Sequence, residues 1–584
     1  MRKTLVTLLA AGTTAATVLL TPGALAAGGD ALVSTGSPPA PFSQNKQNEP
    51  ALAIDAHQPN VLAAGANDNI DMEACNAGDD TTCPFTPGIG SSGIYFSVDS
   101  GNHWTQPTYT GLTARNCLGV PGPDPGCTPQ VGPIGTLPWY YENGLVSDGD
   151  PALAFGPVPG ANGTFSWAHS RLYYANLTAN LNAKKDETFK GFEAIYVSRT
   201  DNPQAAAAND KSAWMPPVRV SKQSSATFAD KEQIWADNAE SSRFFGNVYV
   251  CWENFVGNGA APLDVATSRD GGDTWTQKQV TAAHAVPPKH WGQSGCSVRT
   301  DSRGVVYVFF EEFENPSTFL PPRGTQMLVK SFDGGVSWTR PMALYRITDP
   351  CFALSFDGTS FRCVEDGFAG ARNDLSASPS VDIANGAPTG ADATNEIVNS
   401  WADGRDGLNH EHVLFTYSTQ GGNPGTWAPP APIETSGDRG YYAAPAISPN
   451  GTDVYVTYNA FDNPYATTTA TPRSLVGVFK HATVGGGGTV GSFTEVHRGQ
   501  PGDPRGSSQN NLVIEFLGDY VFSVASRTFG AGVWNDARDA ADCPAIDAFR
   551  QAYQSDHSTP RPAPQQQCKP NFGNTNIYAY TTAP

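Results

Sequence analysis

The sequence predicts an all-β fold, a β-propeller built from four-stranded antiparallel blades. Two observations lead to this prediction. The chain contains 60 glycines and 47 prolines, with 10% aromatic and only 16% charged residues, which is typical of a turn-rich β protein. A set of short strands also recurs in the same order along the chain, and repeated four-stranded sheets are the sequence signature of a radial propeller.

Each repeating unit reads as three strands, here called A, B and C, and a hairpin that leads into strand D. Strand A recurs at seven places, which begin at Glu49, Asp150, Lys231, Gly295, Ser378, Ala444 and Gly518. Strand B recurs in segments such as NVYVCWENF from Asn247 and VVYVFFEEF from Val305. Seven units fit the chain, with six blades as the alternative. A tandem of two β-sandwiches would not produce the recurring strand order.

The last unit predicts how the ring closes. It ends at Pro584 after strand C and lacks a strand D of its own. Because a propeller must close, we expect the segment from about Ala31 to Gln47 to supply the missing outer strand. The predicted organisation is therefore a ring-closing segment at 27–48 and a single propeller domain at 49–584.

The N-terminus and the net charge predict where the protein works. Arg2 and Lys3 precede an apolar run and the triplet Ala24-Leu25-Ala26, so residues 1–26 read as a secretory signal peptide. No other apolar run approaches the roughly 20 residues that a membrane helix needs. A net charge of −19 without a basic cluster argues against nucleic acid and anionic membranes as partners. We expect a secreted, extracellular monomer.

Ten cysteines in an exported chain predict five disulfides. Four pairs are close in sequence, and Cys251 and Cys296 are left for each other. The four close pairs are Cys75 with Cys83, Cys117 with Cys127, Cys351 with Cys363, and Cys543 with Cys568. These spacings differ from those of zinc sites.

The pattern Ser-x-Asp-x-Gly-x-x-Trp-Thr occurs three times, at 97–105, 268–276 and 331–339. Its residues suit a turn, because Asp accepts hydrogen bonds from nearby amides, Gly adopts positive φ and Trp packs between sheets. SVDSGNHWT, SRDGGDTWT and SFDGGVSWT resemble the Asp boxes, or bacterial neuraminidase (BNR) repeats, of sialidase-like propellers. The resemblance places the boxes on the blade periphery, away from an active site.

The resemblance implies a sialidase-like glycoside hydrolase that acts on an extracellular glycan, which could be acidic. Sialidase sites also carry an arginine in a Phe/Tyr-Arg-Ile-Pro motif before the first box. The chain departs from this pattern, because no arginine lies between Ala27 and Arg115. The alternatives are a polysaccharide lyase, with His290 or a tyrosine as its base, and a non-catalytic propeller that binds glycan or protein.

Candidate site residues lie where the A strands begin, because propellers bind ligands at the mouth of the central channel. One half of the mouth is rich in carboxyl groups, namely Glu49, Asp150, Asp230, Glu232 and Asp519, with Lys231 and Tyr520 beside them. The other half offers His290, Trp291, Arg372, Asp374, Arg439, Tyr441 and Tyr442.

Carboxyl groups held close together raise one another's pKa, which allows similar groups to act as acid and base. We predict Asp150 and Glu232 as the acid/base pair and Tyr520 as a further catalytic residue. Arg372 and Arg439 are predicted to contact a substrate anion. The further predicted substrate contacts are Glu49, Trp291, Tyr441, Tyr442 and Asp519. No cofactor is expected to be required, although the acidic half could hold a structural Ca²⁺ ion.

Overall fold

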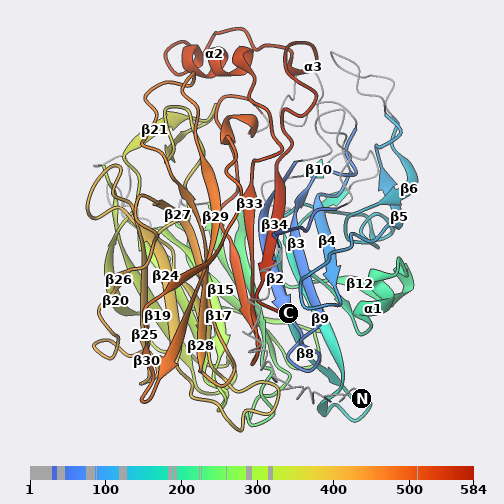
Figure 1. Ribbon diagram of the computed structural model, residues 1–584. Coiled ribbons are helices and arrows are strands. Elements are labelled where there is room, and N and C mark those ends of the chain that lie inside the picture. Colours follow the sequence, from blue (N-terminus) through green and yellow to red (C-terminus); the bar gives the residue numbers. More distant parts are fainter. Residues whose placement is uncertain are drawn as a thin grey trace, which may run out of the picture.

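The computed structural model describes residues 29–35, 46–73, 86, 88–117, 128–181, 187–188, 194–222, 224, 226–257, 260–283, 292–313, 320–508 and 511–583. The predicted signal peptide lies outside these residues. Small antiparallel sheets form the seven blades of a β-propeller (Figure 1), which confirms the predicted fold class. None of the described helices is long and apolar enough to cross a membrane.

The first four blades follow in chain order. Blade 1 holds β2 (Gln47–Ile54), β3 (Leu62–Asp68) and β4 (Ser92–Ser97), and a bridge between Phe96 and Thr105 stands in place of a fourth strand. Blade 2 holds β8 (Ala152–Pro159), β9 (Phe165–Leu181), β11 (Ala194–Thr200) and β12 (Trp214–Arg219), with β7 (Leu145–Ser147) and β10 (Glu187–Thr188) also on β9. Blade 3 holds β13 (Thr227–Ala236), β14 (Val248–Val256), β15 (Leu263–Ser268) and β16 (Thr276–Gln279). Blade 4 holds β17 (Gly292–Thr300), β18 (Val306–Phe313), β19 (Arg323–Ser331) and β20 (Met342–Thr348).

The remaining blades complete the ring. Blade 5 holds β23 (Ser380–Ile383), β24 (Ile397–Asp403), β25 (His412–Ser418) and β26 (Ala431–Pro432). Blade 6 holds β27 (Arg439–Ile447), β28 (Asp453–Phe461), β29 (Leu475–Gly485) and β31 (Thr494–Arg498), with β30 (Thr489–Val490) beside β29. Blade 7 holds β32 (Phe522–Ala525), β33 (Gly530–Asp536), β34 (Asn576–Thr581) and β1 (Ala31–Leu32). Outside the blades lie the hairpin of β5 (Tyr109–Thr113) and β6 (Gln130–Ile134) and the short helix α1 (Pro203–Ala207).

The N-terminal strand closes the ring as predicted. β1 pairs with β34 in antiparallel register, with Ala31 opposite Ala579, and takes the outer position of blade 7. An ion pair of 2.5 Å between Asp30 and Arg538 holds the same segment against the blade. The first and last blades are thereby joined through strands from both ends of the chain.

The three Ser-x-Asp-x-Gly-x-x-Trp-Thr boxes form the turns that their residues predict. In the box at 268–276, Ser268 Oγ donates to Asp270 Oδ1 (2.8 Å), and the same oxygen accepts from the amide of Thr274 (2.9 Å). Gly272 has φ 89°, and its carbonyl accepts from Trp275 Nε1 (3.1 Å). The equivalent serine, aspartate and glycine contacts recur at 97–105 and 331–339. The boxes can therefore be explained by their structural role as hairpin turns.

Asp270→Ala is expected to lower the free energy of unfolding by about 1 kcal/mol, because several turn hydrogen bonds lose their acceptor. Asp270→Asn keeps one acceptor oxygen and should lose less. The midpoint of urea unfolding measures both changes. A midpoint for Asp270→Ala equal to that of the wild type would contradict this structural role of the box.

Three of the predicted disulfides are present. Cys251 on β14 is bonded to Cys296 on β17, so this bridge joins blades 3 and 4. Cys351 is bonded to Cys363 and Cys543 to Cys568, both as predicted. The other two predicted pairs include cysteines that lie outside the described residues.

A cap lies over one end of the propeller (Figure 1). It consists of the hairpin of β21 (Ala353–Phe356) and β22 (Phe361–Val364), residues 511–517, α2 (Pro544–Tyr553) and α3 (Pro564–Gln567). Residues 537–575 connect β33 to β34. Because β33 is antiparallel to β32, this connection leaves the propeller at the end where strand A of blade 7 begins. The cap therefore covers the end of the channel at which the site was predicted.

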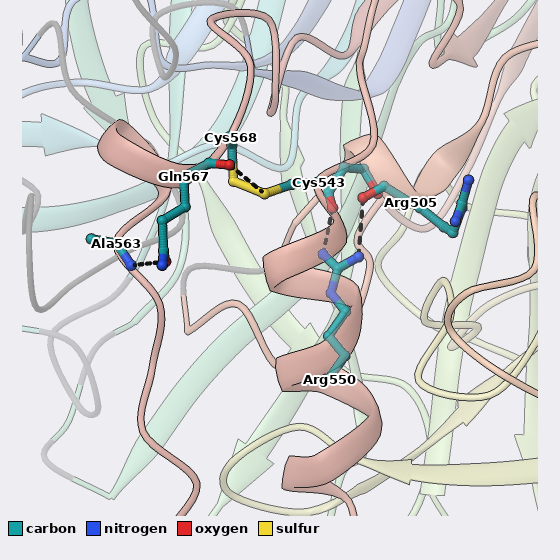
Figure 2. Close-up of a disulfide and its surroundings, with 7 residues drawn as sticks. Arg505, Cys543, Arg550, Ala563, Gln567 and Cys568 are labelled. Atoms are coloured by element: carbon teal, nitrogen blue, oxygen red, sulfur yellow. Dashed lines mark hydrogen bonds between the residues drawn. A yellow bond between two sulfur atoms is a disulfide. The ribbon is translucent and has the colours of Figure 1, made fainter.

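Buried groups hold the cap together. Figure 2 shows the disulfide between Cys543 and Cys568, which ties the start of α2 to the end of α3. It also shows Arg550 of α2, whose fully buried guanidinium donates to the carbonyl of Arg505 (3.0 Å). A further bond reaches the carbonyl of Leu512, which anchors residues 511–517 to the helix.

Candidate functional site

Charged residues in left-handed backbone conformations mark the starts of three A strands. Glu49, Asp150 and Lys231 have φ values of 55°, 50° and 57°. The corresponding position of blade 4 holds Gly295, with φ 61°. This backbone conformation costs about 1–2 kcal/mol for a residue with a Cβ atom, whereas glycine adopts it without that cost. Three charged residues thus occupy strained backbone positions. Such strain is frequent at functional sites.

Asn67 of β3 fixes two of these strained residues. Its side-chain Nδ2 donates to Glu49 Oε2 (2.9 Å). Its Oδ1 accepts from the backbone amide of Asp150 (2.8 Å). One side chain of blade 1 thereby positions both carboxyl-bearing residues at the start of blades 1 and 2.

The ammonium group of Lys231 lies among four carboxyl groups. Its Nζ is 2.6 Å from Asp519 Oδ2, 3.1 Å from Asp150 Oδ2, 3.7 Å from Asp230 Oδ1 and 3.9 Å from Glu49 Oε1. Burial opposes the charged form, but these four neighbours raise the pKa of Lys231 well above its usual value. Lys231 therefore stays protonated and holds together carboxyl groups from blades 1, 2, 3 and 7.

Arg372 forms a second cationic contact in this cluster. Its guanidinium lies 3.0 Å from Asp519 and 3.1 Å from Asp374, and it stacks over the ring of Phe516 from the cap at 4.6 Å. Tyr441 holds this segment in place, because its hydroxyl donates to the carbonyl of Arg372 (2.5 Å). Arg372 is thus an ion-paired residue that links the cap to the acidic cluster.

A cavity of about 60 Å³ lies next to this cluster, inside the channel. Its lining includes Lys231, Glu232, Cys296, Tyr442 and Tyr520, which come from blades 3, 4, 6 and 7. The A strands of several blades therefore converge on one space, as the propeller geometry requires.

Glu232 is the unusual group of this cavity. Its residue is 1% exposed, and neither carboxyl oxygen has a hydrogen-bond partner among the described residues. Burial, followed by the charge of Asp150, raises the pKa of Glu232 well above its usual value. The raised pKa favours the protonated form of this carboxyl group, which could donate its proton to a bound molecule.

Asp150 and Asp519 have the opposite state. Although burial favours their neutral forms, the Lys231 ammonium lowers the pKa of Asp150. Arg372 and Lys231 likewise lower the pKa of Asp519 against the effect of burial. The charged form is thus favoured for both groups, whereas burial favours the neutral form of Glu232. Carboxyl groups whose environments separate their pKa values in this way can serve as an acid and a base in one site.

Tyr520 contributes a second group without a partner. Its hydroxyl is buried and forms no hydrogen bond with the described residues. Burial and the charges of Asp150 and Glu49 raise the pKa of Tyr520 well above its usual value. The hydroxyl therefore remains protonated, so it can donate a hydrogen bond to a ligand but does not act as a phenolate.

The structure brings most of the predicted residues together and separates others. Glu49, Asp150, Glu232, Arg372, Tyr442, Asp519 and Tyr520 belong to the cluster or line the cavity. Arg439 instead pairs with Glu411 through two bonds (2.8 and 3.0 Å) and donates to the carbonyl of Glu365. Tyr441 is fully buried, and its hydroxyl donates to the carbonyl of Arg372. The predicted contact Trp291 and the alternative base His290 lie outside the described residues.

No role was predicted for Lys231 or Asp230, although the sequence places both at the start of strand A. The signal was the run Asp230-Lys231-Glu232, three consecutive charged residues inside a strand that is otherwise uncharged. In the described part of the chain, no group of His, Cys, Asp and Glu side chains has the arrangement of a metal site. The ammonium of Lys231 lies where the carboxyl groups meet.

No protein-family model and no curated protein sequence matches the chain. Among solved structures, a Hadza microbial sialidase matches with a TM-score of 0.39 at 13% identity, over 71% of this chain and 63% of its own. A Trypanosoma rangeli sialidase in complex with an inhibitor matches with a TM-score of 0.36 at 11% identity, over 72% and 53%. An α-L-arabinofuranosidase from Fusarium graminearum matches with a TM-score of 0.34 at 9% identity, over 76% and 94%. The chain thus spans about half to two thirds of the length of these sialidases.

Proposed function

We propose that the protein is an exported glycoside hydrolase that cleaves a glycan end bound in the channel cavity. The observation that carries this proposal is the buried carboxyl group of Glu232, which has no hydrogen-bond partner among the described residues and whose pKa is raised by burial and then by the charge of Asp150. Most glycoside hydrolases use such a pair, one protonated carboxyl group and one carboxylate.

The proposed roles follow from the protonation states. Glu232 donates its proton to the glycosidic oxygen, so that the leaving group departs as an alcohol. Asp150 acts on the other side as the carboxylate that attacks the anomeric carbon or activates a water molecule there. Lys231 keeps Asp150 ionised, and the Tyr520 hydroxyl donates a hydrogen bond to the sugar.

Three further observations support this reading. The strained conformations of Glu49, Asp150 and Lys231 direct charge toward one site. The cavity is lined by residues near the starts of the A strands, and the cap lies over this end of the propeller (Figure 1), where it would limit access of water during the reaction. The three disulfides suit a protein that works in an oxidising compartment outside the cell.

The test is turnover by the purified protein on a panel of aryl glycosides and polysaccharides that includes sialosides and arabinans. Asp150→Asn is expected to lower kcat/KM at least about 1,000-fold, because the carboxylate is lost from the reacting site. Asp556→Asn, at an exposed position beyond α2, is the matched control and should keep full activity. Circular dichroism of the variants checks that both are folded.

Equal turnover by Asp150→Asn and the wild type would remove Asp150 from the mechanism. Absence of turnover on every glycoside would contradict the proposed function. Binding of a glycan without turnover would favour the alternative of a non-catalytic propeller.

A further inference from the structure

A groove of about 520 Å³ lies between blades 4 and 5. Most of its lining residues belong to hairpins that join strand A to strand B or strand C to strand D, and these hairpins lie at the end where the A strands finish. The groove is therefore on the face of the propeller away from the cap and the channel cavity. Its charged lining residues are Arg243, Arg303 and Lys330, and none of the described residues that line it is acidic. This basic lining contrasts with the net charge of −19 of the chain.

Lys330 is a buried cation without an ion-pair partner among the described residues. It is 5% exposed, and its Nζ donates only to neutral oxygens, the carbonyl of Gly421 (2.5 Å) and Asn423 Oδ1 (2.6 Å). Because an ammonium group has three N–H donors, one remains for a ligand. Lysines are seldom buried unless they are paired, and burial lowers the pKa of Lys330 to about 8. An anion in the groove would supply the missing negative charge.

The equivalent position in blade 2 has the carboxylate that blade 4 lacks. Arg199 of β11 and Lys330 of β19 both lie opposite a tyrosine of strand B, and both reach the turn between strands C and D of the next blade. Arg199 donates to the carbonyl of Gly271 (3.2 Å) and to the carboxylate of Asp273 (2.5 Å). In the turn that Lys330 reaches, Asn423 stands in the position of Asp273. The chain thus keeps the cation in blade 4 and has a neutral amide in place of its carboxylate.

Two more side chains of the groove are free to contact a ligand. Arg243 is exposed, and its guanidinium forms no hydrogen bond or ion pair with the described residues. Arg303, in contrast, is paired with Asp301 (2.6 Å). The ring of Phe332 is 60% exposed, and such a ring offers an apolar surface against which the apolar face of a sugar can pack. The groove therefore combines two uncompensated cations with an exposed aromatic ring.

We propose that this groove binds a polysaccharide that carries anionic groups, with one carboxylate or sulfate against Lys330 and Arg243 and a sugar ring on Phe332. Arginine and lysine are the side chains that bind such anionic oxygens. Two cations suit a single anionic group on a sugar, whereas nucleic acids are bound through a longer series of phosphate contacts. The inference goes beyond the proposed function, because the groove is a second site on the opposite face of the propeller and holds a polymer without cleaving it.

Isothermal titration calorimetry of the full chain at about pH 6, below the pKa of Lys330, tests this inference. The probes form two matched pairs, oligogalacturonate with its methyl ester, and dextran sulfate with dextran. In at least one pair the charged member is expected to bind at least about 10-fold more tightly than its neutral analogue. Added salt should reduce this preference. A preference in the first pair alone identifies the anionic group as a carboxylate, and one in the second pair alone identifies it as a sulfate.

Two substitutions test the groove itself. Arg243→Gln should reduce the preference to about 3-fold or less, because one of the two free charges is lost. Asn423→Asp should have the same effect, because it gives Lys330 the carboxylate that Arg199 has in blade 2. Arg219→Gln, at an exposed position on β12 of blade 2, is the matched control and should retain the full preference. Circular dichroism checks that the variants are folded.

Three results would overturn the inference. These are equal binding or no binding of the charged and neutral members of both pairs, an unchanged preference in Arg243→Gln or in Asn423→Asp, and an equal loss of preference in Arg219→Gln. Turnover of small aryl glycosides should be the same in Arg243→Gln as in the wild type, because the groove lies away from the channel cavity. The failure of this inference is therefore distinguishable from the failure of the proposed function.

Discussion

Lys231→Met is expected to destabilise the protein by about 3 to 5 kcal/mol near neutral pH. The substitution removes the ammonium that lies among Asp519, Asp150, Asp230 and Glu49, and it leaves these buried carboxyl groups without their common cation. Methionine is similar in length to lysine and is strained to a similar degree at φ 57°. The loss of stability therefore reports the removal of the charge. Urea unfolding measures it, with the exposed Lys222→Met as the matched control.

The loss of stability in Lys231→Met should change with pH in a predictable direction. In the wild type, Asp150 and Asp519 have lowered pKa values, so their stabilising contribution is present above the ordinary carboxyl pKa and is lost as pH falls. In Lys231→Met the same groups must protonate to stay buried. The difference between the two proteins is therefore expected to be smallest well below the ordinary carboxyl pKa and to grow as pH rises toward 7.

Lys231→Gly separates charge from backbone strain. It removes the same ammonium but also relieves the left-handed conformation, so it should be less destabilising than Lys231→Met by about 1 kcal/mol. A difference between wild type and Lys231→Met that is below about 1 kcal/mol, or that does not change with pH, would contradict the role assigned to Lys231.

Glu232→Gln is expected to lower turnover on any glycoside substrate at least about 1,000-fold while it preserves or increases stability. The amide cannot donate the proton that the carboxyl group supplies. The raised pKa of Glu232, caused by burial and then by Asp150, means that its ionisation opposes folding. Wild-type stability therefore falls as pH rises above the ordinary glutamate pKa, and Glu232→Gln lacks this contribution.

Glu396→Gln is the matched control for this experiment. Glu396 is also 1% exposed, its carboxyl oxygens also lack partners among the described residues, and burial raises its pKa to about 7. It lies on blade 5, outside the residues that line the cavity. It should reproduce the gain in stability at higher pH with unchanged turnover. Full activity of Glu232→Gln, or lower stability than the wild type at every pH, would contradict the assignment.

The fold followed from local sequence signals. The Asp boxes, the recurring A-B-C order and the missing last strand predicted seven blades and the closing strand that β1 provides. These features depend on residues that are neighbours in the chain, namely turn formers and alternating apolar side chains, and such patterns survive without knowledge of the tertiary structure. The pairings of Cys351 with Cys363 and Cys543 with Cys568 followed in the same way, because each pair lies close in sequence.

The sequence by itself also determined which half of the channel mouth is acidic, because counting blades aligned the starts of the A strands. Only the tertiary structure decided how these charges pair. Lys231 meets carboxyl groups from four blades, whereas Arg439 turns to Glu411 and Arg372 to Asp519. Partner choice among buried charges depends on distances of a few ångströms between segments hundreds of residues apart, and one-dimensional patterns do not contain those distances.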